Sequence, residues 1–430
     1  MTKPEVKINT RAIVLEILLE AEKKERMTGM LIHDVLEQYA FLSARDRAFI
    51  KKLAEGTVER QITLDHIINK FSKVKTTKMK NVIRCVLRMG VYQLYFMSHV
   101  PDSAVCNEAV TLVRKKHING LTGFVNGVLR KIASDRIDLE KIDDLSVRYS
   151  MPEWIVKRFI KEAGREKALE MLKASVGTRP VYIRTNTSRI SPDELKSFLN
   201  DEGVKCEEVN GIDYAFRISS FERLYDLKSF NEGLFSVQDI SSMSVAEMLK
   251  IEKDMKIMDI CAAPGGKACH AAEILNGSGS VEARDLSERK IEKIEENISR
   301  LALKNIKTRV YDARTFDDKS EGTFDRIIAD LPCSGLGVIG RKNDLKYRVK
   351  EEDIKELAEL QRDILRNAVR YLRNGGIIVF STCTITNEEG SEQTSFIENE
   401  LGLKKLEERK FFQTENGSDG FYAASFIKEA

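Results

Sequence analysis

Two cysteines, Cys333 and Cys383, are the residues of this chain best suited to covalent chemistry. Cys333 lies in the segment Asp330–Gly335 and Cys383 in the segment Ser381–Thr384. Each segment directly follows a short apolar run that indicates a buried strand. Residues just past the carboxyl ends of parallel strands gather in the ligand crevice of an open α/β sheet, so we expect both thiols in one crevice. Because a thiolate is a strong nucleophile, the pair indicates covalent catalysis.

A loop of small residues follows an earlier predicted strand and precedes a predicted helix. Its sequence is Cys261-Ala262-Ala263-Pro264-Gly265-Gly266-Lys267. A turn of this kind lets a ligand approach the backbone closely, and the helix behind it offers free N–H groups. The loop is not a P-loop, because Gly265 and Gly266 are adjacent and Ala268 follows the lysine. It also lacks the Gly-x-Gly-x-x-Gly spacing, so the pattern predicts a cofactor loop of another type.

Two acidic residues follow the next two predicted strands. Asp285 comes about 20 residues after Gly266, where dinucleotide-binding folds place an acid that binds ribose hydroxyls. Asp312 follows the third strand, in the region that would meet an adenine amino group. Taken singly, each aspartate is equally consistent with an ordinary turn. The loop and both acids together predict an S-adenosylmethionine site.

Thiols beside a methyl donor suggest methylation of a cytosine at C5. C5 is a poor nucleophile until a thiolate adds to C6, after which C5 can attack a methyl sulfonium. This chemistry needs a cysteine nucleophile, a group that polarises N3, and a base for the C5 proton. Cys333 and Cys383 supply the thiols, and Asp330 is placed to pair with the Watson–Crick edge of a flipped base. The residues alone do not rank the two thiols.

The remaining candidate residues favour simpler interpretations. We expect four further cysteines to be small buried side chains: Cys85, Cys106, Cys206 and Cys269. A metal site is disfavoured, because the chain has no Cys-x-x-Cys and His270 is the only histidine in its C-terminal half.

The composition of the whole chain is that of a multidomain globular protein. It has 430 residues, of which 42% are hydrophobic and 32% charged. The start, Met1–Glu5, leads into charged sequence, and no apolar stretch approaches the roughly 18 residues that span a bilayer. Seven cysteines argue against a disulfide framework, so we expect a cytoplasmic protein without a membrane partner. The first 145 residues are basic and the rest mildly acidic, a modest indication of a polyanionic partner.

Periodicity divides the chain into three predicted parts. Residues 1–143 show helical periodicity and predict an all-α domain. Residues 146–230 predict a small α/β unit, with a helix from Pro152 to Ala174, strands at Val181–Arg184 and Ala215–Ile218, and a helix at 192–201 between them. Residues 231–430 alternate strands with helices, which predicts a Rossmann-like, doubly wound α/β core.

The elements of that core are expected from apolar runs and helical spacing. The predicted strands are Ile257–Ile260, Ser280–Ala283, Thr308–Tyr311, Arg326–Ala329 and Gly376–Phe380. The predicted helices are Lys267–Leu275, Ser287–Leu301, Glu352–Leu372 and Glu388–Leu401. Segments Lys404–Phe412 and Tyr422–Ile427 are expected to add an antiparallel hairpin at one edge of the sheet.

These catalytic motifs resemble those of the RNA 5-methylcytosine methyltransferases. The resemblance implies that Cys261–Lys267 is the S-adenosylmethionine loop, and that Asp285, Asp312 and Asp330 are further cofactor and substrate acids. It also implies that Cys383 attacks C6 and that Cys333 assists breakdown of the covalent adduct.

The N-terminal part resembles the NusB helical RNA-binding fold. The matching segments are Arg45–Ala48, Val91–Leu94, Asn107–Val110 and Phe124–Arg130. Such a domain fused to this core resembles the bacterial branch of the family that acts on the small ribosomal subunit. The resemblance therefore implies a monomeric enzyme whose partner is 16S ribosomal RNA, free or partly assembled.

Some positions depart from the family pattern, and other activities stay open. Leu331, Gly390 and Lys342-Asn343 replace more usual residues, which bears on fine substrate contacts rather than on the reaction. One rival is the same chemistry on tRNA or at another rRNA position. A second is a NusB-like RNA-binding factor with an inert catalytic domain. A DNA cytosine methyltransferase is a weaker third, because those enzymes use the Pro-Cys thiol as nucleophile.

Overall fold

The chain folds into two compact units, each described here by itself. The computed structural model describes residues 8–23, 25–413 and 417–429, so Met1–Glu5 lies outside the described residues. The first unit joins the chain up to Gly177 to the later segment Ile339–Arg348. The second consists of Thr178–Val338 and the chain from Val349 onward.

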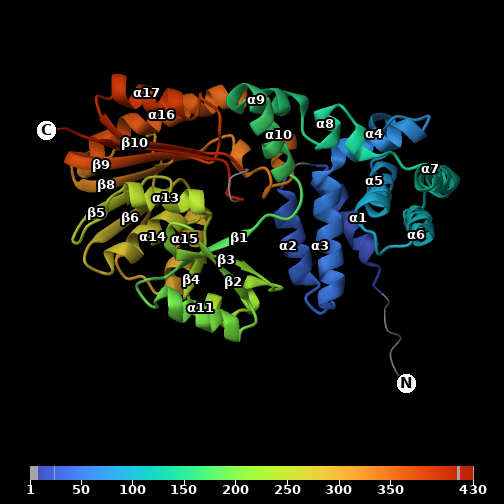
Figure 1. The fold of residues 1–430 in the computed structure, drawn as a ribbon, viewed down its shortest axis with the longest axis horizontal. Helices are drawn as coiled ribbons and strands as arrows, with labels where there is room; N and C mark the ends of the chain where they lie inside the picture. Colours follow the sequence, from blue (N-terminus) through green and yellow to red (C-terminus); the bar gives the residue numbers. More distant parts are fainter. Residues whose placement is uncertain (1–7, 24, 414–416, 430) are drawn as a thin grey trace. The chain divides into compact units, whose positions relative to one another are not determined.

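The first unit is helical, as predicted for the N-terminal part (Figure 1). Its central helix is α5, which is buried on most of its surface because apolar residues occur all round it. Helices α3 and α5 approach closely at Gly56, where a Cβ atom would stand 2.0 Å from the ring of Tyr92. The helices are α1 (Thr10–Ala21), α2 (Thr28–Gln38), α3 (Ala44–Glu59), α4 (Gln61–Phe71), α5 (Asn81–Phe96), α6 (Asp102–Lys115), α7 (Thr122–Ser134), α8 (Leu145–Arg148), α9 (Glu153–Ala163) and α10 (Arg165–Ala174).

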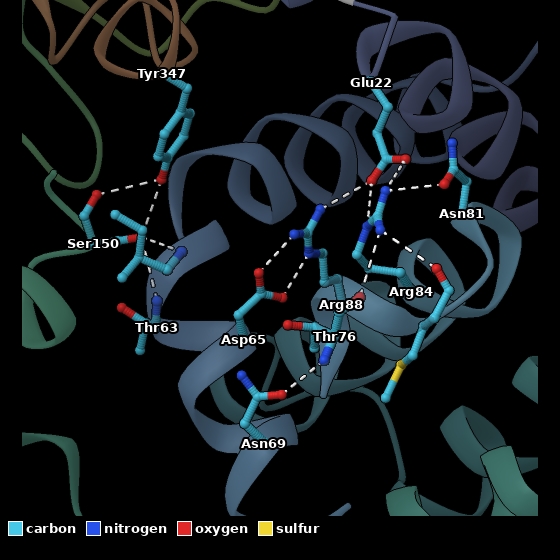
Figure 2. A network of polar contacts seen from close by, with 12 residues as sticks. Glu22, Thr63, Asp65, Asn69, Thr76, Asn81, Arg84, Arg88, Ser150 and Tyr347 are labelled. Atoms are coloured by element: carbon cyan, nitrogen blue, oxygen red, sulfur yellow. Dashed lines mark hydrogen bonds and ion pairs between the residues drawn. The ribbon is translucent and has the colours of Figure 1, made fainter. Parts of the chain in front are cut away.

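Two arginines on α5 hold neighbouring helices through ion pairs (Figure 2). Arg84 donates to both carboxylate oxygens of Glu22, just past α1, at 2.9 and 2.7 Å. Arg88 donates to Glu22 at 3.1 Å and to both oxygens of Asp65 on α4 at 2.7 and 2.6 Å. Because these guanidinium groups are largely buried, each depends on its carboxylate partners.

The segment Ile339–Arg348 is fastened inside the first unit although it follows the Cys333 motif in sequence. The hydroxyl of Tyr347 donates to the carbonyl oxygen of Glu59 at 3.1 Å and lies 3.2 Å from Oγ of Ser150 (Figure 2). Asp344 accepts from the backbone N–H and the hydroxyl of Thr28, at 2.8 and 3.1 Å. The segment Ile339–Arg348 is thus held by hydrogen bonds to both backbone and side-chain atoms of the helical unit.

One predicted helix was wrong. The segment from Pro152 to Ala174 forms two helices, α9 and α10, separated at Gly164. Gly164 has φ 76° and ψ 165°, a conformation that favours glycine and cannot continue a helix. The apolar spacing on both sides of this glycine is helical, so periodicity alone did not show the break.

The second unit begins with a small antiparallel sheet of order β2-β3-β1-β4. Its strands are β1 (Val181–Thr185), β2 (Lys205–Val209), β3 (Ile212–Ser219) and β4 (Phe235–Val237), with helices α11 (Pro192–Asp201) and α12 (Lys228–Asn231). The two predicted strands and the helix between them are present. Strands β2 and β4 were not predicted, because β2 is mostly exposed and charged and β4 is very short.

The larger sheet of the second unit is mixed, with order β10-β11-β9-β8-β5-β6-β7. Strands β5 to β9 run parallel, while β11 pairs antiparallel with β9 and with β10. This confirms the Rossmann-like core and its antiparallel edge hairpin. The strands are β5 (Lys256–Asp259), β6 (Ser280–Asp285), β7 (Ile306–Val310), β8 (Phe324–Asp330), β9 (Leu372–Thr382), β10 (Lys404–Phe411) and β11 (Phe421–Ile427).

Helices cover both faces of this sheet (Figure 1). Alternate residues of each central strand point to opposite faces, as Ile327 and Ile328 do on β8, and both faces are apolar. One face packs against α13 (Ile240–Met248), α14 (Gly266–Leu275) and α15 (Glu288–Leu301), and the other against α16 (Asp353–Tyr371) and α17 (Ser391–Asn399). Helix α17 begins later than the predicted Glu388, because the residues before it turn inward toward the thiols. No helix within the described ranges is long and apolar enough to cross a membrane.

The ion pairs on α5 give a prediction for stability. Glu22→Ala leaves two largely buried guanidinium groups short of a carboxylate, so we expect the free energy of unfolding to fall by about 3 kcal/mol. Glu20→Ala removes only a surface ion pair and should cost less than about 0.5 kcal/mol. Chemical denaturation of both variants measures the difference, and equal losses would contradict the role given to Glu22.

Candidate active site

The order of the core sheet divides the predicted site residues into two groups that meet at its centre. The small-residue loop follows β5, Asp285 is the last residue of β6, and Asp312 follows β7; these three strands are consecutive in the sheet. Cys333 and Cys383 follow β8 and β9, on the other side. Because β5 pairs with β8, the two groups join where the strand order reverses, the position at which such sheets bind ligands.

The small-residue loop is held in a tight turn at the start of α14. Gly265 has φ 102°, and its N–H donates to the carbonyl oxygen of Ala262 at 2.6 Å. A Cβ atom on Gly265 would stand 3.2 Å from Cγ2 of Ile294, so the turn has little room for a side chain there. A Cβ atom on Gly266 would meet nothing within 4 Å, which leaves open space in front of the backbone.

Asp285 lies against this loop. Its buried carboxylate accepts from the backbone N–H of Ala263 at 2.8 Å, and also from Leu286 N–H at 2.7 Å and Lys290 Nζ at 2.8 Å. The structure therefore brings Asp285 and the loop together.

Asp312 is half-buried, just past β7. Its carboxylate accepts from Arg314 at 2.7 Å, and these bonds hold the pKa of Asp312 below its usual value. The preceding residue, Tyr311, donates its N–H to the carbonyl oxygen of Asp285 at 2.8 Å. Asp312 thus lies beside the strand end that carries Asp285, with Arg314 rather than another predicted site residue as its partner.

An ion pair joins the two groups of residues. Lys267, in the first turn of α14, donates from Nζ to Oδ2 of Asp330 at 2.7 Å. Oδ1 of Asp330 accepts from the hydroxyl of Ser381 at 2.7 Å, so this carboxylate touches the ends of both β8 and β9. Burial is the largest single effect and acts to lower the pKa of Lys267, but the charge and hydrogen bond of Asp330, with smaller contributions from other nearby acidic groups, raise it overall, so the ammonium group stays charged.

The two thiols lie next to each other. Sγ of Cys333 is 3.0 Å from Sγ of Cys383, and both side chains are partly exposed. The register of β8 and β9 pairs Asp330 with Ser381, which brings the two cysteine segments to the same level of the sheet. The hydrogen bond with Cys383, followed by burial, raises the pKa of Cys333 well above its usual value. Cys333 is therefore a thiol, and not a thiolate, at neutral pH.

The other cysteines differ from this pair. Cys85, Cys106 and Cys269 are buried as expected, whereas Cys206 is only partly buried. Burial raises the pKa of Cys85 and of Cys269 to about 12. Cys261, in the cofactor loop, also has its pKa raised by burial, so its contribution there is not that of a nucleophile. In the described parts of the chain no group of three His, Cys, Asp or Glu side chains is arranged to hold a metal ion.

Sequence reasoning missed a buried acid beneath the crevice. Asp259 ends β5 and is 1% exposed. Burial, and next the negative charge of Asp330, raise its pKa to about 8. At neutral pH Asp259 is therefore mostly a neutral carboxylic acid.

The sequence also did not predict that the small sheet would contact the small-residue loop and the helix that follows it. Arg184 on β1 is fully buried and pairs with Glu273 on α14 at 2.7 Å. Its guanidinium group also donates to the carbonyl oxygen of Gly266 at 3.0 Å. This sheet therefore fixes the helix and the backbone of the cofactor loop. The sequence did not predict this contact, because an arginine within an apolar strand does not indicate which helix it will bind.

The departures from the family pattern have local explanations. Leu331 is buried, and its N–H donates to the carbonyl oxygen of Ser381 at 3.0 Å, so it packs without facing the crevice. A Cβ atom on Gly390 would stand 3.0 Å from the carbonyl oxygen of Thr386 and 3.1 Å from the ring of Tyr422, which leaves little room for a larger residue. Lys342 and Asn343 lie in the segment that belongs to the helical unit.

The crevice beside β5, β6 and β7 fits S-adenosylmethionine. Such a ligand needs exposed backbone at a helix start and acids at neighbouring strand ends. Gly266 supplies the open backbone, and Asp285 and Asp312 lie at or just past the ends of the next two strands. The residues present therefore match the cofactor predicted from the sequence.

Comparison with known proteins agrees with this fit. Residues 246–427 match the family model described as 16S rRNA methyltransferase RsmB/F. Residues 8–134 match the NusB family, and residues 151–223 match the ferredoxin-like domain of RsmF/B-like methyltransferases.

Individual relatives cover almost the whole chain. The probable ribosomal RNA small subunit methyltransferase B of Bacillus subtilis is 34% identical, over 98% of this chain and 99% of its own. The crystal structure of PH0851 has a TM-score of 0.83 at 21% identity and covers 99% of this chain and 100% of its own, which shows the shared fold. The structure of NSun6 from Pyrococcus horikoshii with SFG has a TM-score of 0.60 at 25% identity, over 65% of this chain and 98% of its own.

The fold and the crevice define an S-adenosylmethionine-dependent methyltransferase with a NusB domain, a ferredoxin-like middle domain and a Rossmann-like core. Each of these parts agrees with the expected fold class. At the level of sequence, the chain belongs to the ribosomal RNA small subunit methyltransferase B family.

Asp285 gives a prediction for cofactor binding. Asp285→Ala removes an acceptor that orients Ala263, so we expect S-adenosylmethionine affinity to fall about tenfold or more. RNA affinity should change much less. Calorimetry measures the first and filter binding the second, with Glu292→Ala, an exposed change on α15, as the control. Unchanged cofactor affinity would remove Asp285 from the site.

The raised pKa of Asp259 gives a prediction for pH dependence. Between the ordinary pKa near 3.8 and the folded value of about 8, the folded state keeps a proton that the unfolded state releases. Stability therefore falls as pH rises through this window. Asp259→Asn removes that contribution, so its melting temperature should fall less than that of the wild type between about pH 5 and pH 8. Asp318→Asn, an exposed change, should keep the wild-type slope, and a wild-type slope in Asp259→Asn would contradict the shift.

Proposed function

We propose that this enzyme methylates C5 of a cytosine in 16S ribosomal RNA through a covalent bond between Cys383 and C6 of the base. The observation that carries the proposal is the pair of thiols 3.0 Å apart at the ends of neighbouring strands, beside the cofactor crevice. A single buried cysteine would fit a structural role equally well, but two adjacent and partly exposed thiols favour a catalytic role.

The proposal gives each thiol a separate role. The Cys383 thiolate adds to C6, and the electron pair of the C5–C6 double bond makes C5 nucleophilic. S-adenosylmethionine, when bound, supplies the methyl group that C5 takes up. Loss of the C5 proton to a base then restores the double bond and expels Cys383. Because the pKa of Cys333 is raised, it is a thiol that can donate a proton to the departing sulfur and so assist release.

Asp330 and the cofactor loop complete the proposed site. Asp330 accepts from Lys267 and from Ser381, two residues before Cys383, and this position supports a role in binding the Watson–Crick edge of an extrahelical cytosine. Cys261–Lys267, Asp285 and Asp312 are the residues that would hold the cofactor.

The substrate is proposed from the relatives and from the domain content. The matched family is described as acting on 16S rRNA, and the NusB match covers the basic N-terminal part. A base must leave its stack to reach Cys383, so we expect a single-stranded or loop site in free or partly assembled rRNA. From the cysteine usage and the family resemblance we further propose a cytoplasmic monomer.

Variants of the two thiols test the mechanism. Cys383→Ala should abolish methyl transfer, because no nucleophile reaches C6. Cys333→Ala should accumulate a covalent RNA–protein adduct, seen as a slow band on a denaturing gel, because release is impaired. Cys206→Ala, a change in the small sheet, should keep wild-type activity and form no lasting adduct. An adduct that formed without Cys383 and required Cys333 would reverse the roles.

Bisulfite sequencing of rRNA tests the substrate. In a strain that lacks this gene, one 16S cytosine should lose its protection, and the wild-type gene should restore it. Restoration by the gene encoding Cys383→Ala, or loss of protection only in tRNA, would contradict the proposed substrate and mechanism.

A further inference from the structure

A buried carboxylate lies between the two thiol segments, and neither the reaction nor the cofactor site uses it. Glu389 precedes α17 and is fully buried. Its Oε1 accepts from the backbone N–H of Ser334 at 2.7 Å, and its Oε2 accepts from the Ser334 hydroxyl at 2.6 Å. Both oxygens thus bind the residue that directly follows Cys333.

Further bonds extend this contact to both cysteine segments. Gln361 on α16 lies within 3.4 Å of Glu389 Oε1 and donates to the carbonyl oxygen of Pro332 at 2.8 Å. The Ser334 hydroxyl lies 3.0 Å from the hydroxyl of Thr384, which follows Cys383. The Thr382 hydroxyl donates to the backbone carbonyl oxygen of Glu389 at 2.9 Å. The residues on both sides of each thiol therefore belong to one hydrogen-bonded cluster.

The cluster is arranged around the acceptor capacity of a carboxylate. An ionised glutamate only accepts hydrogen bonds, and here Ser334 donates twice and Thr386 donates to Oε2 at 2.9 Å. Burial raises the pKa of Glu389, and the bonds from Ser334 act against that rise. Burying a carboxylate is costly unless hydrogen-bond donors surround it. The donors around Glu389 therefore fix the position of its side chain.

The two cysteines depend on this cluster to different degrees. Cys383 directly follows β9, which is paired with β8 as far as Ser381 and with β11 as far as Thr382. Cys333 lies three residues beyond the end of β8, outside the strand pairing. The Cys333 turn is held instead through its neighbours Pro332 and Ser334. Loss of the Glu389 carboxylate should therefore displace Cys333 more than Cys383.

We propose that Glu389 is a positioning residue that holds the Cys333 turn against the Cys383 turn, and so controls release of the methylated RNA. This inference rests on the proposed function, because it assigns Cys333 to release. Glu389 acts through Ser334 and Gln361 and not by contact with the base. Glu389 thereby keeps the Cys333 thiol close to the Cys383 sulfur that leaves C6 of the base.

Glu389→Ala tests the proposal. We expect turnover to fall about 10- to 100-fold, because the releasing thiol is misplaced. The fraction of enzyme trapped as covalent RNA adduct should rise above that of the wild type. The rate of adduct formation and the affinity for S-adenosylmethionine should stay within about twofold, since Cys383 and the cofactor loop are held by other bonds.

A conservative variant separates positioning from loss of packing. In Glu389→Gln the amide oxygen can still accept from Ser334 N–H, and the amide N–H group can donate to hydroxyls that also accept. Glu389→Gln should therefore recover most of the turnover and lower the trapped fraction. Glu392→Ala, an exposed change on α17, is the matched control and should behave as the wild type.

The outcomes separate this inference from the proposed function. Absence of an adduct in Cys333→Ala would refute the release role that the proposed function gives to Cys333, whatever Glu389 does. An adduct in Cys333→Ala together with wild-type turnover and no trapping in Glu389→Ala would refute the positioning role. Equal loss in Glu389→Ala and Glu389→Gln without trapping would also refute it. If Glu389→Ala does not fold, Ser334→Ala replaces it, because it removes only the hydroxyl bonds and should still trap adduct.

Discussion

The carboxylate of Asp330 is the contact on which the rest of the site depends. It accepts hydrogen bonds from Lys267, on the helix α14 that follows β5, and from Ser381 near the end of β9. Asp330 is itself the last residue of β8. Three strand ends are thereby fixed relative to one another, and the cofactor loop is joined to the thiols. Without the parallel pairing of β5, β8 and β9 these side chains would not meet, since they lie far apart in sequence. The small sheet adds a second support, because its buried Arg184 bonds to Glu273 and to the carbonyl oxygen of Gly266, both on α14.

Charge in this crevice is distributed so that neighbouring groups take different protonation states. Asp330 is paired with a charged lysine, and its negative charge helps to keep the buried Asp259 protonated near neutral pH. The hydrogen bond with Cys383 and burial likewise raise the pKa of Cys333. In the proposed mechanism the two adjacent cysteines have different roles, with Cys383 as the nucleophile and Cys333 as the proton donor. The buried Glu389 accepts hydrogen bonds from Ser334, and by our proposal it fixes the turn that carries Cys333.

Much of the fold and part of the site could be predicted from the sequence. The strands of the core are short apolar runs, so the residues just past them could be placed at one edge of the sheet from their positions in the chain alone. The resemblance then distinguished Cys383 from Cys333, which spacing alone did not do. Partnerships across the sheet could not be predicted: Lys267 with Asp330, Arg184 with Glu273, and Glu389 with Ser334. Each pair joins residues that are distant in sequence. A local sequence pattern does not predict which distant polar side chain a buried charged residue will contact. The break at Gly164 was missed for the opposite reason, because one residue overrides a helical pattern that continues on both sides.

The central claim is that Cys383 forms the bond to the base, and mass spectrometry of a trapped complex tests it most directly. Wild-type enzyme would be incubated with S-adenosylmethionine and 16S rRNA in which cytosine is replaced by 5-fluorocytosine. Fluorine at C5 cannot leave as a proton, so the adduct cannot be released. After digestion with nuclease and protease, a methylated nucleotide should be attached to the peptide that contains Cys383. A nucleotide attached to the peptide that contains Cys333, with the Cys383 peptide unmodified, would contradict the account.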